Sequence, residues 1–204
     1  MLQCKSDYFR SSAKLVNGFT LNTKEDLKEM AKIIGLSIPT KLRKNEYAAY
    51  FAESVLTFPD IWLARLTRYE LTLLQKLVAA GPDTYIEEPQ TFMTPSLEFL
   101  SLVIADHDYE KDGKIRYMIC DELREAIAPH INNLLTSKEH ENRYVIEQYL
   151  LGILNLYGLY PYHEIIKRLK EYINDPQVEK EIPAFLLNSI LCRQCGFILM
   201  LRTE

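Results

Sequence analysis

The densest group of basic side chains in the sequence consists of Lys41, Arg43 and Lys44. It is flanked by Thr40 and Asn45, whose neutral polar side chains can hydrogen-bond to an anion. A helix is predicted to begin at about residue 44, and the backbone N–H groups of a helix start, together with Lys and Arg, often contact phosphate oxygens. Positive charge at this end of a helix opposes the helix dipole, so it has no local stabilising role. We expect phosphate contact at these five residues; the alternative is a solvated loop.

A second group of cations, Lys111, Lys114 and Arg116, lies on a predicted β-hairpin with Asp112-Gly113 at its tip. Such a hairpin could touch a phosphate backbone as a wing. Carboxylates outnumber these cations in the same stretch, namely Asp106, Asp108, Glu110 and Asp112. Because these carboxylates repel phosphate, we favour residues 40–45 over the hairpin as the contact.

Cys192 and Cys195 form a C-x-x-C pair, the spacing at which two thiolates chelate zinc or form a redox couple. The pair is predicted to lie at the end of a helix, where the dipole favours the thiol over the thiolate. No second C-x-x-C is present, and Cys4 and Cys120 have no metal-site spacing to the pair. We expect buried structural cysteines, no bound metal and no cofactor.

The four histidines are isolated from one another, and the sequence has no nucleophile elbow, Walker loop, dinucleotide fingerprint or H-E-x-x-H pattern. Catalytic residues that are assembled from distant positions leave no local signature, so an enzyme remains an alternative. We expect a non-enzymatic protein.

The composition bounds the class of protein. Of the 204 residues 48% are apolar, and the formal net charge is -4. This apolar content predicts two or three small domains, and the negative charge means that any nucleic-acid binding must rest on a local basic patch. Residues 1–9 carry no secretory signal, and the most apolar stretch, 184–201, is interrupted by polar residues. We therefore expect a cytoplasmic protein without a membrane span.

Apolar residues at three- and four-residue spacing predict a mainly helical chain. The clearest helix starts are Thr23, before residues 24–34, and the capping box of Thr67 and Glu70, before a helix that ends at Gly81. The other predicted elements are helices at 44–56, 95–103, 121–135, 137–157, between Pro161 and Asn174, and at 183–195, and strands at 104–109, 114–120 and 197–201. The side chains expected to be buried around the basic loop are Leu27, Ile33, Leu36, Phe51 and Val55.

The stretch Thr23 to Leu56 resembles the helix, extended loop, helix modules of the SAP and Rho N-terminal type. The resemblance rests on the leucine-rich first helix ending at Gly35-Leu36 and on the basic segment from Thr40 to Tyr47 that opens the second helix. It implies nucleic-acid binding through the loop and the start of the second helix. The chain departs from the pattern because Pro39-Thr40 replaces the glycine common in the SAP loop, and because the first helix is acidic.

The remainder looks like winged-helix architecture, with helices, a hairpin and a closing helix. The domains expected are residues 1–58 with the SAP/Rho-N-like module at 23–56, a winged-helix-like domain at 59–136, and a second helical, winged-helix-like domain at 137–204, which is truncated if the chain is a fragment of a longer protein. In that last domain the apolar strand 197–201 is expected to be covered by residues 157–162, by a second copy, or by residues of a longer protein.

These observations lead to two hypotheses about function. The first is a non-enzymatic DNA- or RNA-binding protein of the regulatory or accessory kind, whose contacts are Thr40, Lys41, Arg43, Lys44 and Asn45. The second is a protein-interaction adaptor whose helical domains bind a protein partner through the C-terminal region without binding nucleic acid.

Overall fold

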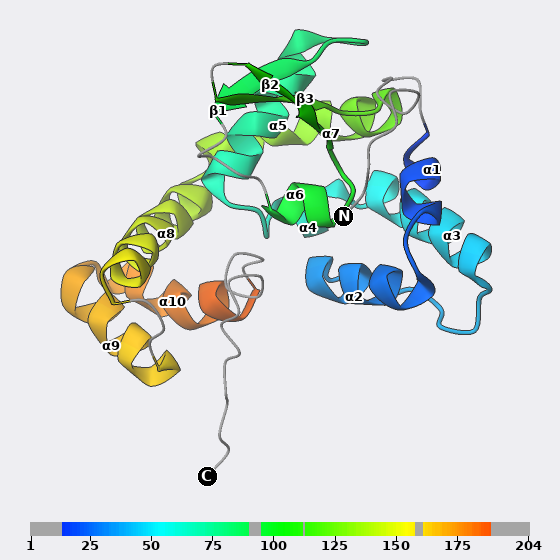
Figure 1. Ribbon diagram of the computed structural model, residues 1–204. Helices are drawn as coiled ribbons and strands as arrows, with labels where there is room; N and C mark the ends of the chain where they lie inside the picture. Colours follow the sequence, from blue (N-terminus) through cyan, green and yellow to red (C-terminus); the bar gives the residue numbers. More distant parts are fainter. Residues whose placement is uncertain (1–13, 90–94, 112, 158–160, 189–204) are drawn as a thin grey trace.

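The structure, a computed structural model, describes residues 14–89, 95–111, 113–157 and 161–188. It confirms a mainly α protein with a short β-hairpin. Figure 1 shows an arch, with α1–α3 on one side, α8–α10 on the other, and the strands with α5 and α7 at the top. The elements are α1 (Leu15–Thr20), α2 (Lys24–Ile34), α3 (Lys44–Thr57), α4 (Pro59–Leu63), α5 (Arg68–Ala80), β1 (Ile86–Pro89), α6 (Pro95–Phe99), β2 (Ile104–Lys111), β3 (Lys114–Met118), α7 (Asp121–Thr136), α8 (Lys138–Tyr157), α9 (Tyr162–Tyr172) and α10 (Pro176–Asn188).

Two helix starts are stabilised by the local signals that the sequence shows. The Thr23 hydroxyl accepts a hydrogen bond from the Asp26 N–H at 3.1 Å, and the Thr67 hydroxyl accepts one from the Glu70 N–H at 3.2 Å. In each case the carboxylate three residues on accepts the N–H of the threonine, which completes a capping box. The prediction of both starts is confirmed.

The predicted hairpin is present as β2 and β3, and a third strand joins it. β1 pairs antiparallel with β3, so the sheet order is β1-β3-β2. Because β1 is polar and ends at Pro89, residues 83–92 showed no strand pattern and β1 was not predicted. Its pairing places Glu87 opposite Arg116.

Two predicted helices have different bounds in the structure. The helix predicted at 95–103 ends at Phe99, because the backbone of Ser101 adopts a positive φ of 54° and turns the chain. The helix predicted at 183–195 begins at Pro176, where the Asp175 carboxylate accepts the Gln177 N–H at 2.9 Å. Pro183 therefore lies inside α10 and does not start it. Residues 189–195 and the strand predicted at 197–201 lie outside the described residues.

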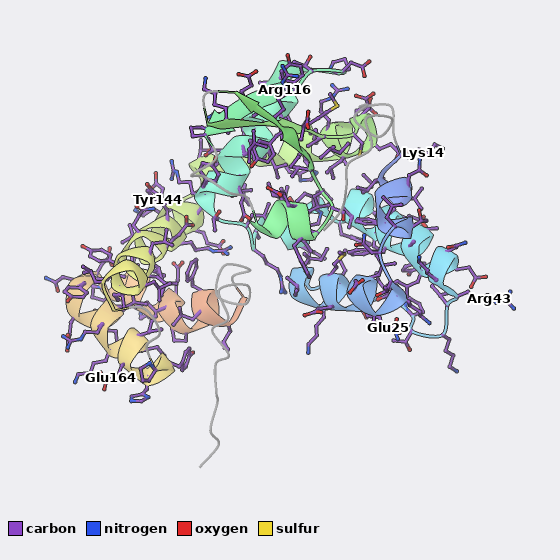
Figure 2. The ribbon with its side chains drawn as sticks, in the orientation of Figure 1. Lys14, Glu25, Arg43, Arg116, Tyr144 and Glu164 are labelled. Carbon is purple, nitrogen blue, oxygen red and sulfur yellow. The ribbon has the colours of Figure 1, made fainter. Side chains whose placement is uncertain are left out.

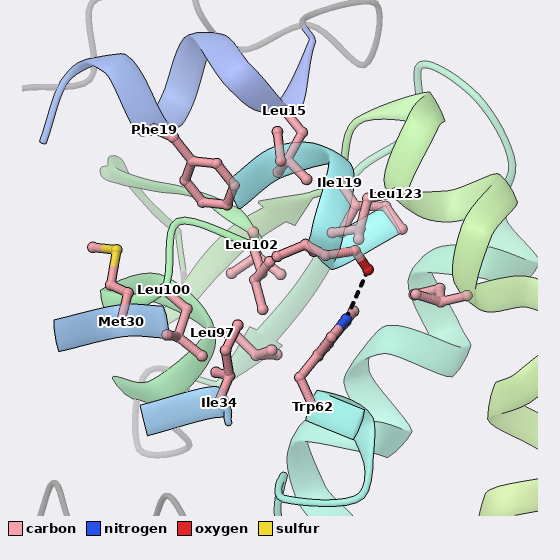
Figure 3. Packing of buried hydrophobic residues seen from close by; sticks show 14 of the residues in the cluster. Leu15, Phe19, Met30, Ile34, Trp62, Leu97, Leu100, Leu102, Ile119 and Leu123 are labelled. Atoms are coloured by element: carbon pink, nitrogen blue, oxygen red, sulfur yellow. Dashed lines mark hydrogen bonds between the residues drawn. The ribbon is translucent and has the colours of Figure 1, made fainter. Parts of the chain in front are cut away.

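A single hydrophobic core joins α1–α7 and the sheet. Phe19 and Phe51 stack at its centre with ring centroids 4.5 Å apart. Trp62 is fully buried beside residues of α2, α6 and α7, and its indole N–H donates to the Val55 carbonyl at 3.0 Å (Figure 3). This core contains residues from Leu15 to Ile131, so the boundary predicted between residues 58 and 59 passes through it.

A second, smaller core lies between α8, α9 and α10. It consists of residues from Ile146 to Leu186, and the boundary predicted between residues 136 and 137 falls between the two cores. The two winged-helix assignments stay predictions. Between β1 and β2, the described residues form one short helix, α6, of five residues. Within the described residues, none of the helices has both the length and the apolar composition that a membrane span requires.

The end of α2 depends on a close approach between Gly35 and Arg65. Gly35 has a φ of 78°, and the Arg65 guanidinium donates to the Ile33 carbonyl at 3.0 Å. A Cβ at Gly35 would lie 2.2 Å from Nη2 of Arg65. Gly113 has a similar φ of 70° but open space around it.

We predict that Gly113→Ala lowers the free energy of unfolding by about 1–2 kcal/mol, the cost of left-handed backbone for alanine. Gly35→Ala lowers the free energy of unfolding by about 1 kcal/mol more than Gly113→Ala, because Arg65 must give up its hydrogen bond to the Ile33 carbonyl. Urea denaturation of both variants measures the difference. In an Arg65→Ala background the extra loss disappears; if it persists, the contact with Arg65 is not its cause.

Candidate nucleic-acid interface

The chain between α2 and α3 is held to the core by alternating side chains. Leu36 and Ile38 are buried, whereas Ser37 and Pro39 between them face solvent. This alternation is that of extended backbone, as expected for the residue that precedes a proline. The two anchors fix the loop on the surface and present residues 40–45 to solvent.

The start of α3 lacks a side-chain cap. Arg43 occupies the N-cap position, and a guanidinium has donors only, so it cannot accept an N–H of the first turn. The Glu46 carboxylate accepts the Arg43 N–H at 2.8 Å. In the described part of the chain, no side chain accepts the N–H groups of Lys44 and Asn45. These donors, together with the positive end of the dipole of this 14-residue helix, are available to an anion.

The predicted cations gather around this helix start. Lys41, Arg43 and Lys44 are exposed and form no ion pair with any described residue. Figure 2 shows the Arg43 side chain directed away from the body of the protein. Thr40 and Asn45 are also exposed, so the structure brings all five predicted residues to one surface.

Lys24 adds a fourth positive charge from outside the predicted segment 40–45. Its ammonium group donates to the Thr40 carbonyl at 3.0 Å and ties the first turn of α2 to the loop. The two residues are 16 positions apart, and no local pattern relates them. Only the pairing of the two helices across the loop places this charge beside Lys41.

Carboxylates near the loop are partly engaged by other groups. Glu25 lies 3.8 Å from the ammonium of Lys28, and Asp26 belongs to the capping box of α2. Hydrogen bonds from the side chain and backbone of Thr23 lower the pKa of Asp26, which therefore stays ionised. These charges weaken the attraction of the loop for a polyanion without neutralising its exposed cations.

The positions of the flanking side chains match the prediction for this module. Leu27, Phe51 and Val55 are fully buried, and Ile33 and Leu36 are 8% exposed. The predicted burial of these five side chains, and the predicted exposure of Lys41, Arg43 and Lys44, are therefore confirmed.

Arg116 of the hairpin has partners among the described residues, unlike the three cations of the loop. Arg116 lies 3.7 Å from the Glu87 carboxylate, and its guanidinium stacks 4.2 Å from the centre of the Tyr85 ring. Both partners come from β1 and the residue before it, a polar segment without a strand pattern in the sequence. Arg116 is thus turned toward its own sheet, while Lys114 is exposed.

The other residues with chemical potential form no site in the described structure. Burial raises the pKa of the Cys120 thiol to about 11, so it stays protonated. His130 contacts the Asp60 carboxylate at 2.6 Å on the surface. No group of three or more described His, Cys, Asp or Glu residues is arranged to hold a metal ion. Cys192 and Cys195 lie outside the described residues.

Comparison with protein-family models, curated proteins and solved structures found no match for this chain.

We predict that Arg43→Ser raises the free energy of unfolding by about 1 kcal/mol, because serine caps the first turn of α3 and completes a capping box with Glu46. Thermal and urea denaturation measure the change. Thr67→Ala, which removes an existing cap, is the matched control and should lower stability by a similar amount. A loss of stability in Arg43→Ser would mean that the guanidinium has a structural role in this loop.

Proposed function

We propose that this protein binds the phosphate backbone of nucleic acid through Thr40, Lys41, Arg43, Lys44 and Asn45. The observation that carries the proposal is the combination of exposed, unpaired cations with an uncapped helix start. Each feature costs stability locally, and a phosphate would satisfy both at once.

The chemistry supports binding without base recognition. Backbone N–H groups, ammonium groups and a guanidinium recognise phosphate oxygens, which carry no sequence information. With three principal cations and a net charge of -4, binding is expected to be weak and strongly dependent on salt. The protein is expected to act in this way without catalysing a reaction.

We predict that Lys41→Ala/Arg43→Ala/Lys44→Ala weakens binding to a labelled 20-nucleotide duplex or single strand without lowering thermal stability. For the duplex, the slope of log affinity against log salt becomes shallower by about 2.7, which corresponds to three lost phosphate contacts. Fluorescence anisotropy from about 50 to 200 mM salt measures both quantities.

The matched control replaces Lys167, Lys170 and Lys180, three exposed lysines of α9 and α10, by alanine. It changes the net charge equally and should retain wild-type binding. Equal weakening in the two triple variants would assign the effect to bulk charge. Absence of wild-type binding at about 50 mM salt would remove the proposal.

A second candidate function is protein docking on the α8–α10 unit. Tyr149 and Tyr172 are 41% and 45% exposed, and their rings stack with an interplanar angle of 4°. They border a cavity of about 340 Å³ whose wall also includes Val145 and Val178. Exposed aromatic groups of this kind are frequent anchors of protein partners. This function predicts that the protein does not bind nucleic acid in the salt titration.

A further inference from the structure

Polar side chains of α8 contact α5, a helix of the first core. His140, Tyr144 and Glu147 follow one another at four- and three-residue spacing and therefore share a face of the helix. His140 and Glu147 are each only 5% exposed. On another side of the same helix, Ile146 and Leu150 enter the second core. Two buried ionisable side chains, His140 and Glu147, therefore lie on this polar face of α8, beside the apolar face that enters the second core.

Glu147 contacts the first turn of α5. Its carboxylate accepts the backbone N–H of Arg68 at 3.1 Å, although Thr67 and the buried Glu70 already cap this helix. The Arg68 guanidinium lies 4.6 Å from the centre of the Tyr144 ring, a side chain labelled in Figure 2. A side chain of the α8–α10 unit therefore supplements the cap of a helix in the first core, 79 residues away.

Charged groups from three helices surround this contact. Arg68 and Glu70 come from α5 and Arg143 from α8, while the Glu181 carboxylate of α10 accepts the Asn142 amide at 2.8 Å. Burial raises the pKa of Glu147 to about 7, and the charge of Glu70 adds to this effect. The Arg68 N–H, Arg143 and the Arg68 guanidinium act in the opposite direction.

His140 has the reverse preference in the same environment. Burial, followed by the charges of Arg143 and Arg68, lowers its pKa to about 4. Its Nε2 atom is buried and has no hydrogen-bond partner among the described residues. Arg143 also lies near Glu139, Glu147 and Glu181, and burial lowers its pKa. The docked arrangement therefore holds His140 neutral.

We propose that Glu147 is a latch that docks the α8–α10 unit onto the first core, and that docking transfers one proton from His140 to Glu147. Between pH 4.5 and 6.5 the undocked state carries the proton on the imidazole, and its carboxylate is ionised. In the docked state the imidazole is neutral and the carboxyl group is protonated, while its second oxygen still accepts the Arg68 N–H. Within this pH range the number of bound protons is the same before and after docking, and solvent carries the exchange.

The sign of each contribution follows from linkage. The pKa of Glu147 is raised from 4.5 to about 7, so its contribution to docking is lost as pH rises between these values. The pKa of His140 is lowered from 6.5 to about 4, so its contribution is gained as pH rises between those values. Between pH 4.5 and 6.5 the two effects cancel, and docking is insensitive to pH.

Substitution of either residue leaves the pH dependence of docking that is due to the other residue. In Glu147→Gln the docking equilibrium constant rises about tenfold per pH unit between pH 4.5 and 6.5, relative to wild type. In His140→Gln it falls about tenfold per pH unit over the same range, because only the carboxyl group remains. Hydrogen exchange of the Arg68 amide, corrected for its intrinsic rate, measures the constant, and the Leu74 amide reports unfolding of α5 as a whole.

Glu141→Gln and His163→Gln are the matched controls, because they neutralise the same residue types on exposed parts of α8 and α9. Both should keep the wild-type pH dependence. Retention of that dependence in Glu147→Gln and His140→Gln, or slopes of the same sign in the two, would overturn the proposal. An NMR titration of His140 in the intact protein tests it without any variant: titration near pH 4 supports the latch, and titration near pH 6.5 contradicts it.

Discussion

The fold of the first core depends on the burial of Trp62 against the end of α3. The last carbonyl groups of a helix have no partner within it, and the Trp62 indole N–H supplies one to Val55. This bond lets the largest apolar side chain enter the core without an unsatisfied polar atom. It also fixes α4 against α3, so that the α2–α3 pair packs on the same core as α6 and α7 (Figure 3). The position of the basic loop follows from this attachment.

The helix starts of the first core differ in how their first turns are capped. α2 and α5 begin with a threonine and a carboxylate that satisfy each other's backbone donors. α3 begins with Arg43, which cannot accept a hydrogen bond and whose charge opposes the dipole. Buried Leu36 and Ile38 compensate by holding the loop against the core. The unfavourable start of α3 therefore follows a basic loop that buried side chains attach to the core.

The α8–α10 unit is attached to the rest of the chain in a different way. Its own core is apolar, but its contact with α5 consists of Glu147, Tyr144 and Arg68. Polar contacts of this kind contribute less free energy than apolar burial and are sensitive to the ionisation of their members. The two apolar cores share no residue, so the proposed latch at Glu147 would join two units that each keep a core of their own.

The sequence by itself determined the local structure around the candidate interface. Helix ends depend on residues within one helical turn, so they were predicted from Thr23, Gly35 and the Thr67–Glu70 pair. The spacing of Leu27, Phe51 and Val55 predicted that these side chains are buried. Asp112-Gly113 predicted the hairpin for the same reason. The tertiary structure decided every contact between distant residues. The strand β1 with its Glu87–Arg116 pair, the Lys24–Thr40 bond and the Glu147–Arg68 bond each join segments at least 16 positions apart. Local periodicity carries no information about such pairs, because they depend on how the apolar faces pack.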